Sequence, residues 1–200
     1  MLLRHVGRAA ARSSGRQPEV EVRRVLPLLF RSGWAVMVPD TIDFAKYSRD
    51  GCMRLLADCM LGRLARWLRI LGYDTVYESN ATDHEVARRA RSEGRVVLTS
   101  DRELSGRRGL KAVLIRSHDV RDQVREVQRA LGPPPEPSLS RCPVCNAALK
   151  EISAQQAACR VPPHVIETQD VFRECRCCGR VYWRGSHVDA MEELLGDLPS

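Results

Sequence analysis

From residue 53 onward, apolar and polar positions follow two alternating periods, one typical of strands and one typical of helices. A mostly apolar run at 53–57 ends at Asp58, which predicts a buried strand. Over 59–71 the apolar residues return at helical spacing, and Gly72 is placed to end that helix. The leucines of this apolar stripe are Leu61, Leu64, Leu68 and Leu71.

The same alternation continues to residue 131. Strand-like runs follow at residues 75–77, 96–100 and 112–115. Between the first two, Thr82 and Glu85 have the spacing of a capping box that opens a helix ending near Gly94. A further helix is expected at 120–131. Strands that alternate with helices predict an α/β fold with a parallel sheet, right-handed crossovers and flanking helices.

Composition divides the chain after this α/β segment. The stretch 132–137 is Gly-Pro-Pro-Pro-Glu-Pro, which sustains neither a helix nor a strand ladder and predicts a stiff linker. Residues 19–50 lack a clear period, although one helix is expected around 22–30. The expected organisation is a partly disordered leader, an α/β domain, the linker, a small cysteine-rich ribbon and a tail, at residues 1–50, 51–131, 132–140, 141–191 and 192–200.

The positive charge comes almost entirely from arginine. Lys and Arg number 32 against 25 Asp and Glu, which gives a formal net charge of +7, and only three of the basic residues are lysines. Because guanidinium groups bind phosphate in a bidentate way and stack on bases, this bias favours a nucleic-acid partner. A solvated basic surface is the alternative. No apolar run approaches the about 20 residues of a membrane-spanning helix, so no membrane partner is expected.

Two features bear on the compartment. The eight cysteines occur without a secretory signal segment, which favours a reducing compartment such as the cytoplasm or nucleus. The first 18 residues hold four arginines and no acidic residue, which is also typical of a mitochondrial presequence. A disordered basic leader, or the remnant of a longer upstream region, explains the same pattern.

Four cysteines form two pairs with the spacing of zinc knuckles. They are Cys142, Cys145, Cys175 and Cys178. Four thiolates complete a tetrahedral shell and predict a closed, structural zinc site. The second cysteine of each pair precedes Asn146 or Gly179, residue types that tolerate the positive φ of such a turn, which favours Cys178 over Cys177. The stretch between the pairs exceeds the usual about 15 to 20 residues and indicates an insertion. Ordinary buried cysteines are the alternative.

Three aspartates are expected at one edge of the sheet. Asp58 and Asp101 each follow an apolar strand directly, and the carboxyl ends of parallel strands share one edge. Asp83 opens the crossover helix on the same side. Such carboxylates suit Mg²⁺ or Mn²⁺, which activates water and neutralises charge on a phosphodiester. Alternatively, Asp58 is an N-cap and Asp83 stabilises a helix N-terminus.

Two further sets of residues extend this predicted site. The candidates for a fourth metal ligand are Glu85, Glu103 and Asp119. Three arginines on the helix after Asp58 are placed to contact a nucleic-acid backbone, namely Arg63, Arg66 and Arg69. The alternatives are structural, since Glu85 completes a capping box and the arginines form a solvated face opposite the leucine stripe.

Four segments together carry a resemblance to a known family. They are Asp-Cys-Met-Leu-Gly-Arg-Leu-Ala-Arg-Trp-Leu-Arg from Asp58, Leu-Gly-Tyr-Asp from Leu71, Leu-Thr-Ser-Asp from Leu98, and Cys-Gly-Arg-Val-Tyr-Trp-Arg-Gly-Ser-His from Cys178. Over roughly residues 54–191 the chain resembles the C-terminal RNase domain of the mut-seven (Nibbler-type) exonuclease family. This resemblance implies a PIN-like nuclease fold with a zinc ribbon fused behind it.

The resemblance also implies roles for individual residues. Asp58 and Asp101 become the expected catalytic metal ligands, and Asp83 is the next. His187 matches the family motif, and a hydrogen-bonded structural role is expected for it. Full-length members place a 3′-to-5′ exonuclease domain ahead of this one. The residues before Asp50 are too few to contain it, so a short form is expected.

The expected function is that of a metal-dependent ribonuclease acting on single-stranded RNA. In this hypothesis Mg²⁺ or Mn²⁺ binds at Asp58, Asp83 and Asp101, while zinc is structural. One alternative is a catalytically silent RNA- or protein-binding module that is an accessory of a larger exonuclease. Another is a structural adaptor held by zinc. The family resemblance further implies protein partners in small-RNA processing.

Overall fold

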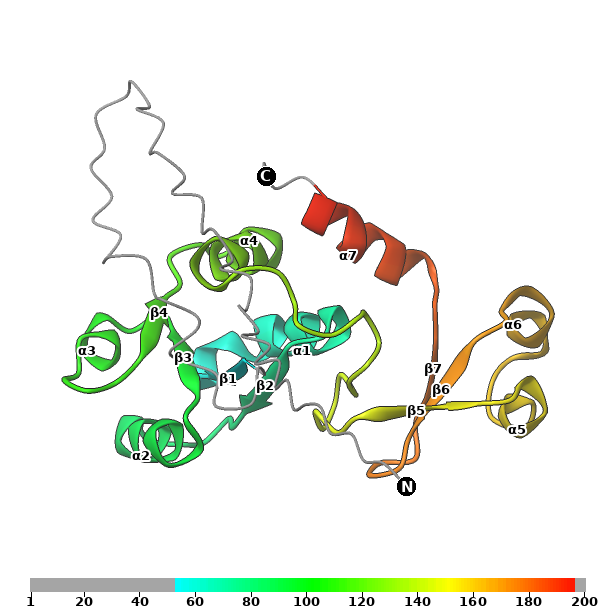
Figure 1. The fold of residues 1–200 in the computed structure, drawn as a ribbon, viewed down its shortest axis with the longest axis horizontal. Coiled ribbons are helices and arrows are strands. Elements are labelled where there is room, and N and C mark those ends of the chain that lie inside the picture. The colour runs from blue at the N-terminus through cyan, green and yellow to red at the C-terminus, as the bar shows by residue number, and fades with distance from the viewer. Residues whose placement is uncertain (1–52, 197–200) are drawn as a thin grey trace, which may run out of the picture. The chain divides into compact units, whose positions relative to one another are not determined.

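The computed structural model describes residues 53–196, which form a parallel α/β domain followed by an antiparallel ribbon (Figure 1). The expected leader at 1–50, with the helix expected around 22–30, lies outside the described residues. None of the described helices has both the length and the apolar character that crossing a membrane requires.

Four parallel strands form the sheet of the α/β domain, in the order β2-β1-β3-β4. Their bounds are β1 Arg54–Ala57, β2 Asp74–Tyr77, β3 Val96–Thr99 and β4 Ala112–Leu114. The central strands are apolar along most of their length because helices cover both faces of the sheet. The parallel sheet that the sequence predicts is therefore confirmed.

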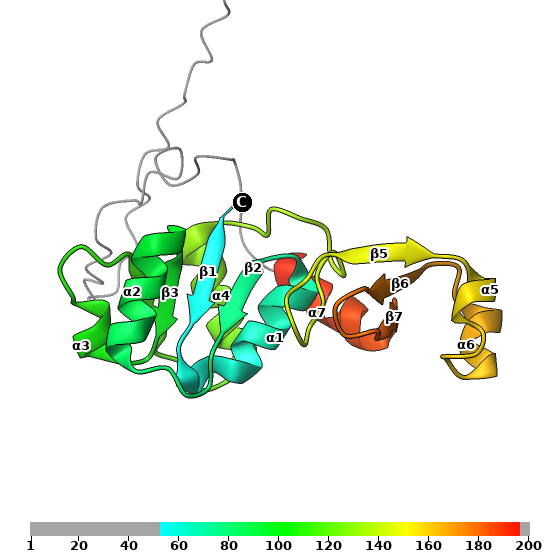
Figure 2. The same cartoon turned by 90° about the horizontal axis from the view of Figure 1, so that it is seen from below.

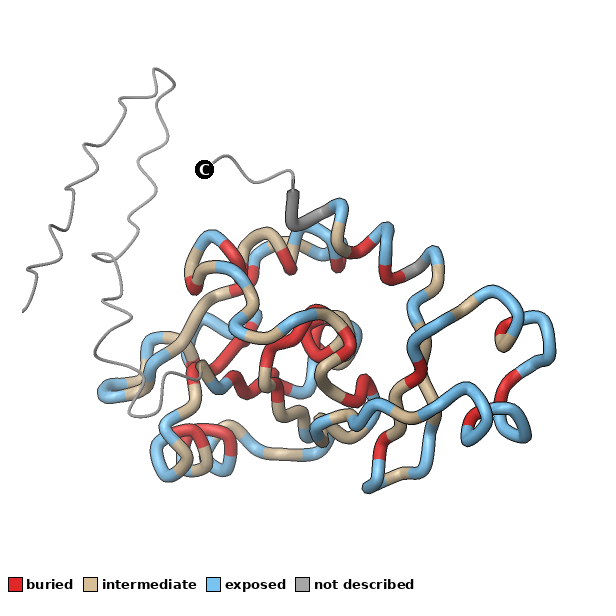
Figure 3. The backbone as a smooth tube through the Cα atoms, turned by 45° about the vertical axis from the view of Figure 1, so that its right-hand side comes forward, coloured by how far each residue is buried: buried red, intermediate tan, exposed pale blue. Residues whose placement is uncertain are grey.

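The helices lie on both faces of the sheet (Figures 1 and 2). They are α1 Gly62–Leu71, α2 Asp83–Glu93, α3 Arg102–Ser105 and α4 Val120–Leu131. Helices α1 and α4 pack on one face, where the leucine stripe of α1 meets Leu98 and Val124. Helices α2 and α3 pack on the other face, around Leu56 and Val97. In Figure 3 the buried positions gather along the strands and along the helix faces that touch them.

Two local details follow or refine the predicted pattern. Thr82 and Glu85 form the predicted capping box, and Gly94 ends α2 in the left-handed conformation. The helix expected over 59–71 begins instead with a 3-10 turn, η2 (Cys59–Leu61), before α1 starts at Gly62. Asp58 caps this turn, since its carboxylate accepts the Cys59 N–H at 2.6 Å. The predicted helix is thus present with a tighter first turn.

The ribbon is an antiparallel sheet of three strands in the order β5-β6-β7. The strands are β5 Leu149–Ile152, β6 Phe172–Cys175 and β7 Val181–Trp183. Two short helices, α5 Ala154–Ala157 and α6 Pro163–Thr168, lie between β5 and β6. They pack on Phe172 through a small apolar cluster of their own. These helices are the insertion that lengthens the stretch between the two cysteine pairs.

The last described element, α7 (Ser186–Gly196), returns to the α/β domain. It contacts α1 and α4, and Met191 belongs to the same apolar core as the leucine stripe. The helix continues past residue 191, where the sequence predicts the end of the ribbon and the start of a tail. Met191 gains its burial from the tertiary contact with α1 and α4, which a local pattern does not reveal.

Candidate metal centre and acidic edge

Four cysteine sulfurs form a compact group in the ribbon. Among the described residues, theirs is the one set of three or more potential metal ligands whose ligand atoms all lie within 4.8 Å of one another. The set is Cys142, Cys145, Cys175 and Cys178. The Sγ atoms of Cys142 and Cys178 are 3.6 Å apart, and those of Cys145 and Cys175 are 3.4 Å apart. The group predicted from the sequence is therefore assembled.

The two knuckles have matching backbone geometry. Asn146 has a φ of 65° and donates its N–H to the Cys142 carbonyl at 2.9 Å. Gly179 has a φ of 72° and donates its N–H to the Cys175 carbonyl at 2.8 Å. Both residues therefore adopt the left-handed conformation expected of them. Cys177 is exposed and does not belong to the group.

The thiols of the four cysteines differ in pKa. Burial raises the pKa of Cys145 and of Cys175, whereas the backbone N–H of Arg180 lowers the pKa of Cys178 to about 6. Burial, reinforced by the neighbouring Cys142, raises the pKa of Tyr182, whose protonated hydroxyl lies 3.2 Å from the Cys142 sulfur. Four sulfur ligands with no open position fit a structural metal such as zinc.

The first knuckle is fixed to the α/β domain by a buried arginine. Arg69, on α1, is only 6% exposed, and its Nε donates to the Thr75 carbonyl at 2.7 Å. One guanidinium nitrogen also donates to the carbonyls of Pro143 and Val144, at 3.1 and 2.8 Å. The prediction that Arg69 contacts nucleic acid or solvent is wrong, because the side chain is buried and its Nε and one terminal nitrogen donate to backbone carbonyls inside the protein.

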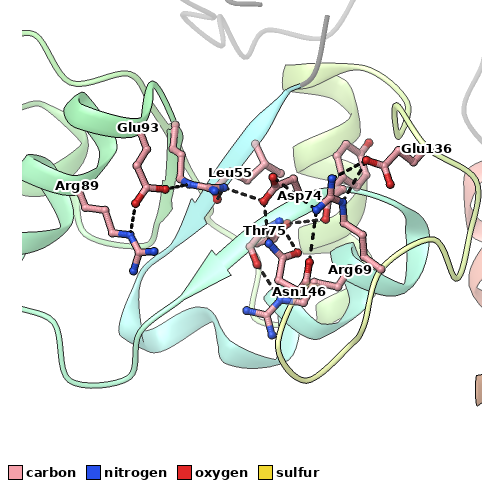
Figure 4. A network of polar contacts seen from close by, with 11 residues as sticks. Leu55, Arg69, Asp74, Thr75, Arg89, Glu93, Glu136 and Asn146 are labelled. Carbon is pink, nitrogen blue, oxygen red and sulfur yellow. Dashed lines mark hydrogen bonds and ion pairs between the residues drawn. The ribbon is translucent and has the colours of Figure 1, made fainter. Parts of the chain in front are cut away.

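Asn146 makes a second link between the knuckle and strand β2. Its side-chain oxygen accepts the Thr75 N–H at 3.1 Å, and its side-chain nitrogen donates to the Asp74 carboxylate at 2.7 Å (Figure 4). Asp74 also pairs with Arg95 at 2.8 Å and with Arg141 at 3.6 Å. Strand β2 lies at the edge of the sheet, where another strand could pair with it. On this open side, the side chains of Arg69 and Asn146 form hydrogen bonds with the backbone carbonyl and N–H of Thr75.

At the carboxyl edge of the sheet, two of the predicted aspartates are joined through Thr99. Asp58, 5% exposed at the end of β1, accepts the Thr99 hydroxyl at 2.9 Å. The same hydroxyl accepts the Asp101 N–H at 2.9 Å, while the Asp101 carboxylate accepts the Glu103 N–H at 2.6 Å as the cap of α3. Thr99 has no exposed surface. Its role was not predicted from the sequence, although a polar residue at the end of an apolar strand was an available signal.

The third aspartate lies on the same edge but is engaged elsewhere. The Asp83 carboxylate pairs with Arg107 at 3.2 Å, and both side chains are partly exposed. Desolvation raises the pKa of the Cys59 thiol, although the residue is exposed, and the charges of Asp58 and, more weakly, Asp83 act in the same direction. Even so, the described acidic residues form no set of three ligands as compact as the cysteine group.

The remaining candidates lie on the surface. Arg63 and Arg66 are exposed on α1, as expected. Glu85 completes its capping box, Glu103 is exposed, and Asp119 caps α4 by accepting the Arg121 N–H at 2.8 Å. The side chain of His187 lies outside the described part of the chain. The structure therefore assigns capping roles to two of the three candidate fourth ligands.

Comparison with known proteins gives two matches. A model of the family described as the Mut7-C RNAse domain matches residues 53–195. The human protein named Exonuclease mut-7 homolog is 31% identical over 146 residues, which are 71% of this chain and 13% of that relative. The chain therefore spans a small part of the relative's length. No solved structure matches the chain.

Proposed function

The chain belongs to the Mut7-C RNase domain family, and from this premise we propose that it is a metal-dependent ribonuclease acting on single-stranded RNA. In this proposal Asp58 and Asp101 hold Mg²⁺ or Mn²⁺, Asp83 is the third ligand, and zinc at the four cysteines is structural. Arg63 and Arg66, both exposed on α1, contact the RNA backbone.

The observation that carries the proposal is the hydrogen-bonded chain from the Asp58 carboxylate through the Thr99 hydroxyl to the backbone N–H of Asp101. It joins the ends of two adjacent strands, at the sheet edge where α/β proteins bind ligands. A buried carboxylate without a cationic partner is costly, and among the described residues Asp58 has no ion pair with an arginine or lysine. A divalent cation would supply the missing positive charge.

Arg107 is the competitor of the metal at Asp83. The side chains of Arg107 and Asp83 are each about 40% exposed, and ion pairs of this kind contribute only about 0.2–1 kcal/mol to stability. A divalent cation can therefore displace the guanidinium, which is then free to bind a phosphate of the RNA. When bound, the cation would activate water and stabilise negative charge at phosphorus. The protein's own residues hold the carboxylates and orient the strand.

The test is cleavage of end-labelled single-stranded RNA in Mn²⁺, with the purified zinc-loaded protein. Asp58→Asn and Asp101→Asn should each reduce cleavage about 100-fold or more, since losing a metal ligand should cost at least as much as the about 10–100-fold loss for a residue that only supports a ligand. Thr99→Val should reduce it about tenfold, because Asp58 loses its orienting hydroxyl. Thr75→Val is the matched control, since the hydroxyl of this equally buried threonine donates only to the Tyr73 carbonyl at 3.4 Å. Equal cleavage by all these proteins would end the catalytic proposal.

A second candidate function is a catalytically silent RNA-binding module. The capping roles of Asp58 and Asp101 and the Arg107 pair of Asp83 favour it, because these contacts account for the carboxylates without a metal. This reading predicts RNA binding that falls steeply with salt and survives both aspartate-to-asparagine substitutions, with no cleavage in Mn²⁺. Measuring binding and cleavage on the same proteins separates the two functions.

A further inference from the structure

A small cavity lies in the ribbon, far along the chain from the acidic edge. Its volume is about 170 Å³, and it is bounded by the linker, by strands β6 and β7 and by the first turn of α7. The lining residues are Ser138, Leu139, Val171, Arg173, Tyr182, Trp183, Arg184 and Val188. They combine two aromatic rings, two guanidinium groups and three aliphatic side chains.

The polar walls of this cavity are held in place. The Tyr182 hydroxyl is anchored 3.2 Å from the Cys142 sulfur, which fixes the direction of the ring. Arg173 donates to the carbonyls of Ser138 and Leu139, at 3.1 and 2.8 Å. Arg184 pairs with Asp189 at 2.8 Å and also with Glu192, so its charge is balanced by these two carboxylates of α7. Because these side chains are already ordered, a guest would bind without the entropic cost of fixing them.

The chemistry of the lining selects the kind of guest. None of the described residues that line the cavity is acidic, and its volume is well below the about 300 Å³ at which pockets for drug-sized ligands begin. Flat aromatic rings, together with guanidinium planes, are the surfaces on which single-stranded RNA bases stack. We propose that this cavity binds one base of the single-stranded RNA, a proposal that rests on the RNA substrate proposed above.

The neighbouring knuckle supplies charge for the adjacent phosphates. Arg176 and Arg180 are exposed on the turn between β6 and β7, and neither forms an ion pair with a described carboxylate. The Arg180 guanidinium interacts with the Cys178 sulfur, so Arg176 is the main candidate for contact with a phosphate. Val171, directly before β6, lines the cavity and is 44% exposed, so it marks the entrance. An RNA strand can therefore place a base beside Val171 and its phosphates along the second knuckle.

A larger groove elsewhere fits RNA less well. It has a volume of about 840 Å³ and is lined by residues of the loop after β2 and of α2. Its lining includes Glu78, Glu85 and Glu93, and Arg89 is already paired with two of these carboxylates. The acidic side chains repel phosphate, whereas the ribbon cavity presents cationic and aromatic groups.

The experiment pairs two similarly exposed valines. Val171→Glu puts a carboxylate at the entrance of the cavity, and Val144→Glu puts one on the first knuckle, where the valine is 45% exposed. Both variants change the net charge equally, so long-range repulsion of RNA is matched. Binding of a fluorescent single-stranded oligonucleotide is measured in the Asp58→Asn background without Mg²⁺ or Mn²⁺, so the readout does not depend on cleavage.

We expect Val171→Glu to weaken RNA binding about tenfold and Val144→Glu to weaken it less than about twofold. A 5-iodouridine oligonucleotide should crosslink to the wild-type protein within residues 171–184, with Tyr182 or Trp183 as the main sites. Thermal melts of both variants must match the parent protein, since both positions are exposed. A melting temperature that falls only for Val171→Glu would show that Val171 has a structural role, and it would overturn the proposal.

Other outcomes would also overturn the proposal. If the two variants bind RNA with equal affinity, or if crosslinks map only to the α/β domain, the cavity does not bind an RNA base. Failure of the nuclease proposal has a different signature, because cleavage would then be absent while Val171→Glu still weakened binding. The two proposals can therefore fail separately.

Discussion

Substitution of Asn146 separates the turn of the first knuckle from its contact with the α/β domain. Asn146→Gly keeps a residue that readily adopts the φ of 65° but removes both side-chain hydrogen bonds to β2. The matched control is Gly179→Asn at the equivalent place of the second knuckle. There the φ is 72°, and an added Cβ would meet nothing within 4 Å.

The expected loss of stability follows from the two hydrogen bonds. The bond to the Asp74 carboxylate, at 2.7 Å, involves a charged group and contributes about 1.5–3 kcal/mol. The bond from the fully buried Thr75 contributes about 0.5–1.5 kcal/mol. Asp74 keeps its contacts with Arg95 and Arg141, which favours the lower end, so the free energy of unfolding should fall by about 2–4 kcal/mol. For Gly179→Asn we expect less than about 1 kcal/mol.

The assay is thermal unfolding of the zinc-loaded protein, followed by calorimetry. The Asn146→Gly variant should melt about 5–15 °C lower, while its zinc affinity in competition with a chelator should stay unchanged because the four thiolates and the turn remain. Equal melting temperatures for the variant and the parent, or an equally large drop for Gly179→Asn, would refute the assigned role of Asn146.

The difference should also depend on pH through Asp74. Burial acts to raise the pKa of this carboxyl, but hydrogen bonds from Arg95 and Asn146 and the charge of Arg141 lower it overall. Because the folded-state pKa lies below the unfolded one, the ionised carboxylate stabilises the fold above about pH 4, and this contribution disappears as pH falls through the folded-state pKa. The stability gap between the parent and Asn146→Gly should therefore narrow below about pH 4. A constant gap down to pH 2 would contradict this assignment.

Three further predictions concern the same interface. Arg69→Met should lower the free energy of unfolding by about 3 kcal/mol in urea, because buried carbonyls lose their donor, whereas Arg66→Met on the exposed side should change it by less than about 0.5 kcal/mol. Gly72→Ala should lower the free energy of unfolding by about 3 kcal/mol or more, because the φ is 102° and the added Cβ would lie 2.1 Å from the backbone carbonyl oxygen of Glu136. Gly94→Ala, whose Cβ would meet nothing within 4 Å, should lower it by about 1–2 kcal/mol. Removing zinc with a chelator should lower the melting temperature of the α/β domain as well as that of the ribbon. A melting temperature of the α/β domain that does not change when zinc is removed would contradict the contacts between the ribbon and this domain.

The described elements differ in how far the sequence predicted them. Strand positions, the helix Val120–Leu131 and the Thr82 capping box agree with the pattern because periodicity and capping are properties of a few neighbouring residues. The same holds for Asn146 and Gly179, whose positive φ follows from residue type and the spacing of the cysteines. The aspartates at the sheet edge agreed only in position. In the structure Asp58 and Asp101 cap helical turns and Asp83 pairs with Arg107, and the sequence pattern did not identify all of these partners.

By itself, the sequence determined the parallel sheet, the knuckle turns and the cysteines that gather as possible metal ligands, since each follows from short-range stereochemistry or spacing. Only the tertiary structure decided that Arg69 is buried against carbonyls 74 and 75 residues away, and that Asn146 serves both its turn and strand β2. An arginine on a helix looks the same in sequence whether its face meets water or another part of the chain. Which face is covered depends on the packing of distant segments, and this packing fixes the ribbon to the α/β domain.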